Sequence, residues 1–164
     1  MEIIMAILSI ITEEDSTGEA FLRKTSRSVD KITPRIITLL DDMKDTLHKA
    51  NGVGLAAVQV GVLRRVVIIE VEEGQLIELI NPEITEFSGN QNEAEGCLSI
   101  PGKWGITERP MKVTVRALDR NGKSFTISGE GLLARAFCHE LDHLDGKLFT
   151  DNVVRMLSED EIEA

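Results

Sequence analysis

The stretch "FCHELDHLDGKLF", residues Phe137 to Phe149, decides the fold because it contains two histidines four positions apart, with Glu140 directly after the first. Residues four apart on a helix project from the same face, so the imidazoles of His139 and His143 can reach one metal ion. Helical periodicity extends from about 130 to 145, and a glycine then indicates the end of the helix. We therefore expect a central helix whose two histidines face inward.

The alternative for the same residues is a pair of buried core histidines bonded to the backbone. Glu140 favours the metal site, because it is rotated by about 100° from His139 and can reach a group bound beside the histidines. A tetrahedral catalytic site needs a third protein ligand and one open position. No histidine follows His143, and the acids far enough along the chain lie in an acidic tail. We therefore look for the third ligand upstream.

A cysteine in "EGCLSIP", Glu95 to Pro101, is the upstream candidate. A thiolate from Cys97 completes a set of one cysteine, two histidines and a water, a combination suited to catalytic zinc. Taken alone, Cys97 is also consistent with a small buried hydrophobic residue. The second cysteine, Cys138, leaves the helix at roughly 100° from His139, and we expect it to be buried and inert.

Composition restricts the class of protein. The chain has 164 residues and a net charge of -10, so we expect one domain spanning 1–164, and we expect it to bind neither DNA nor an anionic membrane. The apolar run Ile3 to Ile11 has no basic residues before it and is too short to cross a bilayer. We expect this segment to pack on the core, the protein to be cytoplasmic, and its two cysteines to form no structural disulfide.

The remaining pattern predicts one further helix and a strand-rich middle. Thr33 and Pro34 suit a helix start, apolar residues then recur at helical spacing, and "NG" at 51–52 stops the pattern. The unbroken apolar run in "RRVVIIEV", residues 64–71, predicts a buried strand. The stretch "LIELINPEITEF", residues 76–87, predicts two short strands broken at Asn81 and Pro82.

The clearest hairpin is "KVTVRALDRNGKSFTIS", residues 112–128, whose "NG" suits a tight turn. Two helices around this strand-rich middle, without regular βαβ alternation, predict an α+β fold. We expect mostly antiparallel strands around the histidine helix, with an amphipathic helix nearer the N-terminus. The acidic tail, residues 155–164, is predicted to be a short helix or disordered.

Three motifs together resemble the signature motifs of peptide deformylases: "GVGLAAVQ" at 52–59, "EGCLS" at 95–99 and "HELDHLDG" at 139–146. The resemblance implies a metal-dependent hydrolase that removes the formyl group from formylmethionyl nascent peptides at the ribosome and releases formate. It also implies one divalent metal held by Cys97, His139 and His143. Fe²⁺ is the expected native ion, and Zn²⁺, Ni²⁺ or Co²⁺ can replace it in purified protein.

The resemblance also implies residue roles. Glu140 would act as general base and then general acid, while the side-chain amide of Gln59 and the backbone N–H of Leu98 would stabilise the oxyanion. Gln59 stands in an otherwise apolar loop, where an amide is costly to bury without a partner. The residues expected to bind substrate are Gly52, Val53, Gly54, Leu55, Gly96 and Leu132.

Two other functions remain open on the residues alone. One is a metallopeptidase that uses the same helix with a glutamate of the tail as third ligand, in which case Cys97→Ala would spare the metal. The other is a non-catalytic relative that binds peptide termini. The joint presence of Gln59, Cys97 and the three residues of the HExxH motif argues against the second alternative.

Overall fold

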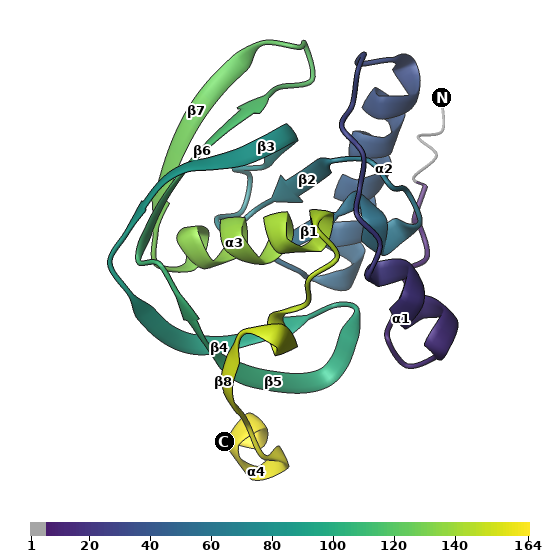
Figure 1. Ribbon diagram of the computed structural model, residues 1–164. Coiled ribbons are helices and arrows are strands. Elements are labelled where there is room, and N and C mark those ends of the chain that lie inside the picture. Colours follow the sequence, from purple (N-terminus) through teal and green to yellow (C-terminus); the bar gives the residue numbers. More distant parts are fainter. Residues whose placement is uncertain (1–5) are drawn as a thin grey trace.

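The computed structural model describes residues 6–164 and confirms an α+β fold with antiparallel sheets (Figure 1). The helices are α1 (Ser16–Leu22), α2 (Pro34–Ala50), α3 (Leu132–Leu144) and α4 (Glu159–Glu163), with 3₁₀ turns η1 (Ala57–Val60) and η2 (Phe149–Asp151). The strands are β1 (Gly54–Ala56), β2 (Val66–Ile69), β3 (Ile77–Ser88), β4 (Gln91–Cys97), β5 (Ile100–Arg109), β6 (Lys112–Leu118), β7 (Ser124–Glu130) and β8 (Val153–Met156).

The strands form two sheets. One has five strands in the order β1-β2-β3-β6-β7, and the other has three in the order β4-β5-β8. Every pairing between these strands is antiparallel. The hairpin expected at 112–128 is confirmed as β6 and β7, which pair from Lys112↔Glu130 to Leu118↔Ser124.

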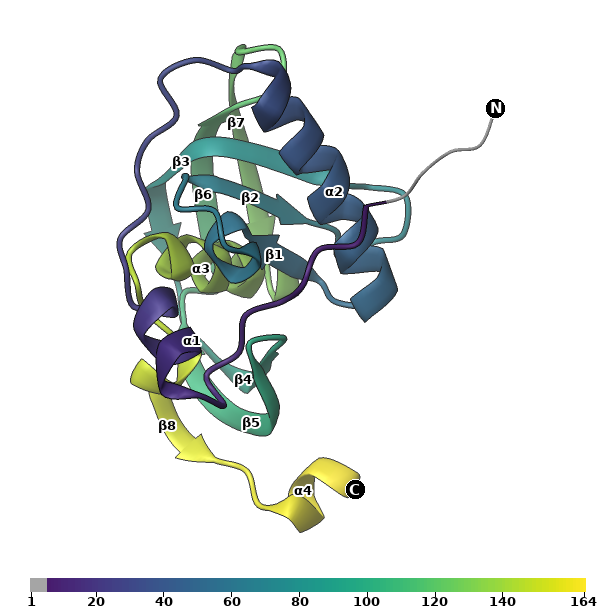
Figure 2. The same cartoon turned by 90° about the vertical axis from the view of Figure 1, so that its right-hand side faces the viewer.

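The five-stranded sheet is covered on both faces around β2, which is why that strand is apolar throughout. Val67 and Ile69 pack in the cluster that contains α3, whereas Val66 and Ile68 pack in the cluster that contains α2. Successive side chains of a strand alternate between its faces, so each pair faces a different helix. Figures 1 and 2 show α2 and α3 on opposite sides of β2.

Helix α3 lies between the two sheets and therefore fixes the position of the histidines. It contacts β1, β2, β6 and β7 of the larger sheet and β5 of the smaller one. The helix begins after Gly131, whose φ of 59° is accessible mainly to glycine. A bend is needed there because β7 and α3 are separated by this single residue. The chain thus turns directly from the sheet edge into the interior.

The prediction of two short strands at 76–87 is wrong. The segment forms one long strand, β3, with a register shift between Ile80 and Glu83. Asn81 adopts φ 51°, and its side chain accepts a hydrogen bond from Val29 N and donates one to Val29 O, both at 2.8 Å. This residue therefore forms a bulge that is stabilised by a distant loop, and pairing continues beyond it.

Both ends of the described chain carry elements that the sequence did not predict. Near the N-terminus, α1 is capped by Asp15, whose side chain accepts from Gly18 N at 2.6 Å. The run expected to pack on the core is partly confirmed: Ile11 N donates to Gln59 O at 2.7 Å, whereas residues 1–5 lie outside the described part. Near the C-terminus, the unpredicted strand β8 pairs with β5, and α4 then forms a short helix, one of the two expectations for residues 155–164. Within residues 6–164, no helix is both long and apolar enough to cross a membrane.

Candidate active site

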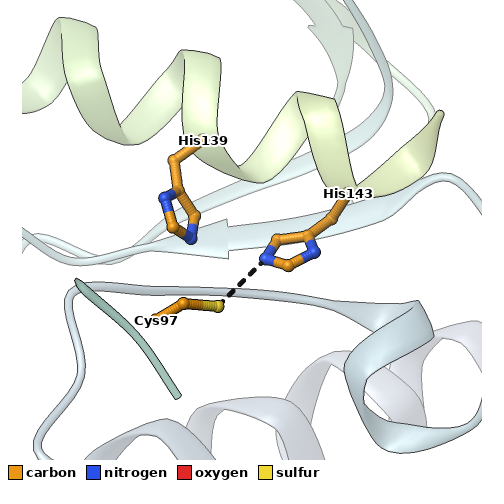
Figure 3. Close-up of side chains that lie close together, drawn as sticks. All are labelled: Cys97, His139 and His143. Atoms are coloured by element: carbon orange, nitrogen blue, oxygen red, sulfur yellow. Dashed lines mark hydrogen bonds between the residues drawn. The ribbon is translucent and has the colours of Figure 1, made fainter. Parts of the chain in front are cut away.

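Helix α3 and strand β4 bring the three expected metal ligands together. His139 and His143 lie one turn apart on α3 and point from the same face toward Cys97, the last residue of β4 (Figure 3). Their ligand atoms all lie within 4.8 Å of one another, and Cys97 Sγ is 3.4 Å from His143 Nε2. Two such ligands on one tetrahedral ion would be about 3.5 Å apart, given typical metal–sulfur and metal–nitrogen lengths.

The surroundings of the histidines also fit a cation. His139 Nδ1 lies 2.9 Å from Glu95 Oε1, so its Nε2 is the nitrogen directed to the cluster. Burial lowers the pKa of His139, but Glu140, Cys97 and Glu95 together raise it well above its ordinary value. Burial and the neighbouring His139 hold the pKa of His143 well below the ordinary value, which favours the neutral, ligating form.

The two imidazoles differ in their second contacts. Glu95 orients the ring of His139, as carboxylates commonly do for metal-binding histidines. His143 Nδ1, in contrast, is buried and has no hydrogen-bond partner among residues 6–164. One thiol and two imidazoles are ligands of the types that bind iron or zinc, so the donor set fits a metal of this kind.

A buried ion pair anchors Glu95 to the opposite strand. Arg109 of β5 donates through Nε and Nη2 to the two Glu95 oxygens, each at 3.0 Å, and through Nη1 to Asp142 Oδ2 at 2.8 Å. Thr107 also donates to Glu95. Burial raises the pKa of Glu95, but the hydrogen bonds from His139 and Arg109 outweigh it and lower the pKa to about 2. Glu95 is therefore a carboxylate at neutral pH.

Glu140 is a second buried carboxyl, but it has no such support. Its Oε1 has no hydrogen-bond partner in the described part of the chain, and its Oε2 lies 4.0 Å from His139 Nε2. Burial is the main cause that raises the pKa of Glu140 to about 7. A Cβ atom at Gly54 would stand 2.7 Å from Glu140 Oε2, so the glycine provides the space for this carboxyl group. A carboxyl with such a pKa beside a cation site can exchange protons near neutral pH.

Gln59 is held with its amide nitrogen toward the cysteine. The 3₁₀ turn η1 buries the side chain, Oε1 accepts from Ala56 N at 2.9 Å, and Nε2 donates to Ser99 Oγ at 3.0 Å. The same Nε2 lies 3.7 Å from Cys97 Sγ. The amide thus has the partners that its burial requires, and its donor end faces the ligand cluster. Leu98 follows Cys97 in the turn between β4 and β5.

A pocket of about 470 Å³ opens beside this cluster. Five of the six residues expected to bind substrate line it: Gly52, Val53, Gly54, Gly96 and Leu132. The sixth, Leu55, is fully buried in the core cluster of α2 and is not among the lining residues. Cys97, Leu98, Gln59, His139 and Glu140 also contribute to the lining.

Comparison with known proteins gives the family. The model of the polypeptide deformylase family matches residues 9–159. The chain belongs to the polypeptide deformylase family. It is therefore a hydrolase that removes the formyl group from N-formylated peptides, and its family is metal-dependent.

Similar deformylases cover nearly the whole chain. A peptide deformylase from Caldicellulosiruptor bescii is 57% identical over 159 residues, covering 97% of this chain and 93% of the relative. One from Acetivibrio thermocellus is 60% identical over 146 residues, covering 89% and 85%.

Two solved deformylase structures have the same fold. A peptide deformylase from Legionella pneumophila has a TM-score of 0.85 at 45% identity and covers 90% of this chain and 86% of that one. One from Synechococcus elongatus, solved in complex with actinonin, has a TM-score of 0.85 at 36% identity and covers 93% and 83%.

Sequence reasoning assigned no role to the Glu95–Arg109 pair of this deformylase, although a signal for it exists. Gly105, Thr107 and Arg109 are the alternating buried positions of β5, so the period of a strand directs Arg109 inward. A charged residue at an inward position requires a partner. The partner itself, Glu95, could not be selected from the 28 acidic residues without the pairing of β4 with β5.

Proposed function

We propose that Cys97, His139 and His143 hold one divalent metal and that Glu140 moves the protons in the hydrolysis of N-formylmethionyl peptides. The observation that supports this most strongly is the arrangement of the three ligand atoms within 4.8 Å of one another, beside a buried carboxyl that lacks a hydrogen-bond partner in residues 6–164. A structural metal site would have no need of that carboxyl group.

The reaction requires one proton to move twice. A bound divalent cation supplies Lewis-acid polarisation and makes water a nucleophile near neutral pH. Glu140 takes the proton of the attacking water as the new C–O bond forms at the formyl carbon. When the C–N bond breaks, Glu140 donates that proton to the departing nitrogen, which leaves as an amine. The products are formate and a peptide with a free N-terminus.

Negative charge on the formyl oxygen during attack requires donors already in position. Gln59 Nε2 is oriented by the bonds that hold both ends of its amide group. The backbone N–H of Leu98 is the second proposed donor, because Leu98 follows a ligand residue and lines the pocket. Comparable donors in other enzymes contribute roughly 2.7–4 kcal/mol to transition-state stabilisation.

The peptide is proposed to extend along the glycines of the pocket. Gly54 begins the edge strand β1, and Gly96 lies near the end of β4, so both can bring the backbone close to a substrate chain. Val53 and Leu132 would contact the methionine side chain. Nascent chains emerging from the ribosome in the cytoplasm are the proposed source of such peptides.

We propose Fe²⁺ as the native ion, with Zn²⁺, Ni²⁺ or Co²⁺ able to replace it. The thiolate and two imidazoles suit all four ions. Which ion is bound therefore depends on the availability of each metal as well as on the affinity of the site for it. The iron form should lose activity in air, since both the metal and the sulfur of Cys97 can be oxidised.

The test is formate release from formyl-Met-Ala-Ser by the Fe²⁺-loaded protein and by Glu140→Ala. We expect turnover only with Glu140 present and equal metal content in both proteins; an inactive iron-loaded wild type would refute the proposal. The metallopeptidase alternative needs a tail glutamate as ligand. Glu159, Glu161 and Glu163 lie exposed in α4, outside the ligand cluster, and metal loss in Cys97→Ala would exclude that alternative.

A further inference from the structure

Arg135 brings a positive charge to the wall of the substrate pocket. It lies four residues before His139 on α3, so both side chains project from the same face of the helix. The pocket is lined by Leu132, Arg135 and Ala136 of α3 together with Ala94 and Gly96 of β4. Arg135 therefore leaves α3 about one helical turn before His139, one of the proposed metal ligands.

The guanidinium of Arg135 is held in place but only partly satisfied. Its Nη1 donates to Gln91 Oε1 at 3.0 Å. Gln91 is itself fixed, because its Nε2 donates to Pro110 O at 2.9 Å and to Gly131 O at 3.0 Å. Arg135 Nε is buried and has no acceptor among residues 6–164, and no carboxylate of those residues forms an ion pair with this side chain. Of the five N–H donors of the guanidinium, only one on Nη1 has an acceptor in the described part of the chain. Nε is enclosed, so Nη2, which is neither enclosed nor bonded to residues 6–164, is the nitrogen left for a ligand in the pocket.

A donor at the wall of a largely apolar pocket loses its water when a ligand fills the pocket, so it should favour a ligand that carries an acceptor. Methionine offers only a weak acceptor, its thioether sulfur. Oxidation to the sulfoxide adds a polar S=O group at the same position along the side chain. A sulfoxide entering an apolar pocket would normally lose its hydration without compensation, whereas here a charged N–H can replace the water.

We propose that Arg135 donates a hydrogen bond to the side chain of the first residue and so enables the enzyme to deformylate peptides that begin with formylmethionine sulfoxide. This rests on the proposed function, because the hydrolysis itself is unchanged and only the pocket for the first side chain is concerned. Arg135 acts as a specificity determinant and takes no part in proton transfer.

The test compares three peptides, formyl-Met-Ala-Ser, its methionine sulfoxide form and its norleucine form. Norleucine has the length of methionine and no acceptor. The quantity measured is the ratio of kcat/KM for the sulfoxide peptide to kcat/KM for the norleucine peptide. This ratio is independent of the fraction of active enzyme, so partial misfolding of a variant leaves it unchanged.

We expect the ratio to fall about tenfold in Arg135→Met, since a hydrogen bond to a charged group is lost. Arg135→Lys keeps the charge and should give an intermediate ratio. Arg116→Met is the control, because Arg116 lies on β6, is exposed and does not line the pocket. Its ratio should equal that of the wild type.

A second readout avoids turnover. In a Glu140→Gln background, calorimetry should show the same loss of preference for the sulfoxide peptide in binding affinity. Equal ratios in wild type and Arg135→Met would overturn the role of Arg135 while leaving deformylation intact. Absence of formate release from all three peptides would instead refute the proposed function.

Discussion

Glu95 Oε1 lies 2.9 Å from His139 Nδ1, and Arg109 binds both oxygens of the same carboxylate from the opposite strand. The Glu95 carboxylate that orients the His139 imidazole is therefore itself fixed by Arg109. Because Nδ1 is engaged, Nε2 is presented to the ligand cluster, and the negative charge makes the ring a stronger ligand. Residues of β4 and β5 thus set the orientation of His139 on α3.

Glu95→Gln should weaken metal binding roughly 10- to 100-fold, the usual effect of losing such a partner. The amide keeps the shape of the side chain but removes the charge that faces His139 and Arg109. Competition with a coloured chelator measures the dissociation constant. Glu93→Gln is the matched control, because Glu93 is exposed on the same strand. Equal affinities in the two variants would show that Glu95 does not support the metal.

Thiol labelling should distinguish the two cysteines. Cys138 is buried, and burial raises the pKa of its thiol to about 11, so at pH 8 only about one thiol in a thousand is ionised there. In the metal-free folded protein, iodoacetamide should modify Cys97, which lines the pocket, and leave Cys138 nearly unmodified. Adding Zn²⁺ should slow the reaction of Cys97 at least about tenfold, because a coordinated sulfur is no longer free to react.

Peptide mapping by mass spectrometry assigns the modified residue, and Cys97→Ala provides the control that should remain nearly unlabelled. If Zn²⁺ left the labelling rate of Cys97 unchanged, the cysteine would not be a ligand. Labelling of both cysteines in denaturant confirms that the reagent is in excess.

The parts of the fold that follow local rules could be predicted from the sequence. The histidine helix and the hairpin at 112–128 were predicted because helical spacing and an "NG" turn act over a few residues. Cys97 was a candidate ligand from its residue type, but its distance from His143 depends on the packing of β4 against α3. Only the resemblance to a family indicated that the two would meet.

Features that depend on distant partners could not be predicted. Asn81 reads locally as a strand break, yet its amide is bound by Val29, 52 residues away, and the strand continues. For Arg135, helical spacing gives the same face of α3 as His139 but does not indicate what its guanidinium contacts. Its role depends on Gln91, which reaches it from the start of β4. In both cases a contact with a residue distant in the sequence determines the role of the side chain.

Asp151→Asn should lower stability at neutral pH and have little effect at low pH. Arg23 Nη1 lies 2.6 Å from Asp151 Oδ2, and this hydrogen bond is the main cause that lowers the pKa of Asp151. A carboxyl whose pKa is lowered on folding stabilises the native state above its unfolded pKa of about 3.9. That stabilisation is lost as the pH falls through the lower, folded value. The effect should be at most about 1 kcal/mol, because both side chains are 39% exposed and solvent screens the pair.

Urea unfolding at pH 7 and at pH 2.5 measures this difference. Asp160→Asn is the control, because Asp160 is exposed in α4 and forms no ion pair with any residue of 6–164. A difference between the Asp151 variant and wild type that stayed constant across the two pH values would mean that the charge of Asp151 is not the source of the stabilisation.

Gly54→Ala should reduce kcat while leaving the metal bound. The added Cβ would lie 2.7 Å from Glu140 Oε2 and 2.9 Å from its Cδ and Cγ, so the carboxyl group must shift. A displacement of about 1 Å in a catalytic group can cost on the order of a hundredfold in rate. The three atoms nearest to this Cβ all belong to Glu140, and none belongs to a proposed metal ligand, so metal content should match the wild type. Steady-state kinetics with formyl-Met-Ala-Ser and metal analysis of the same sample provide both values. A normal kcat in Gly54→Ala would mean that the position of the Glu140 carboxyl is not critical, and the general-base assignment would then have to be abandoned.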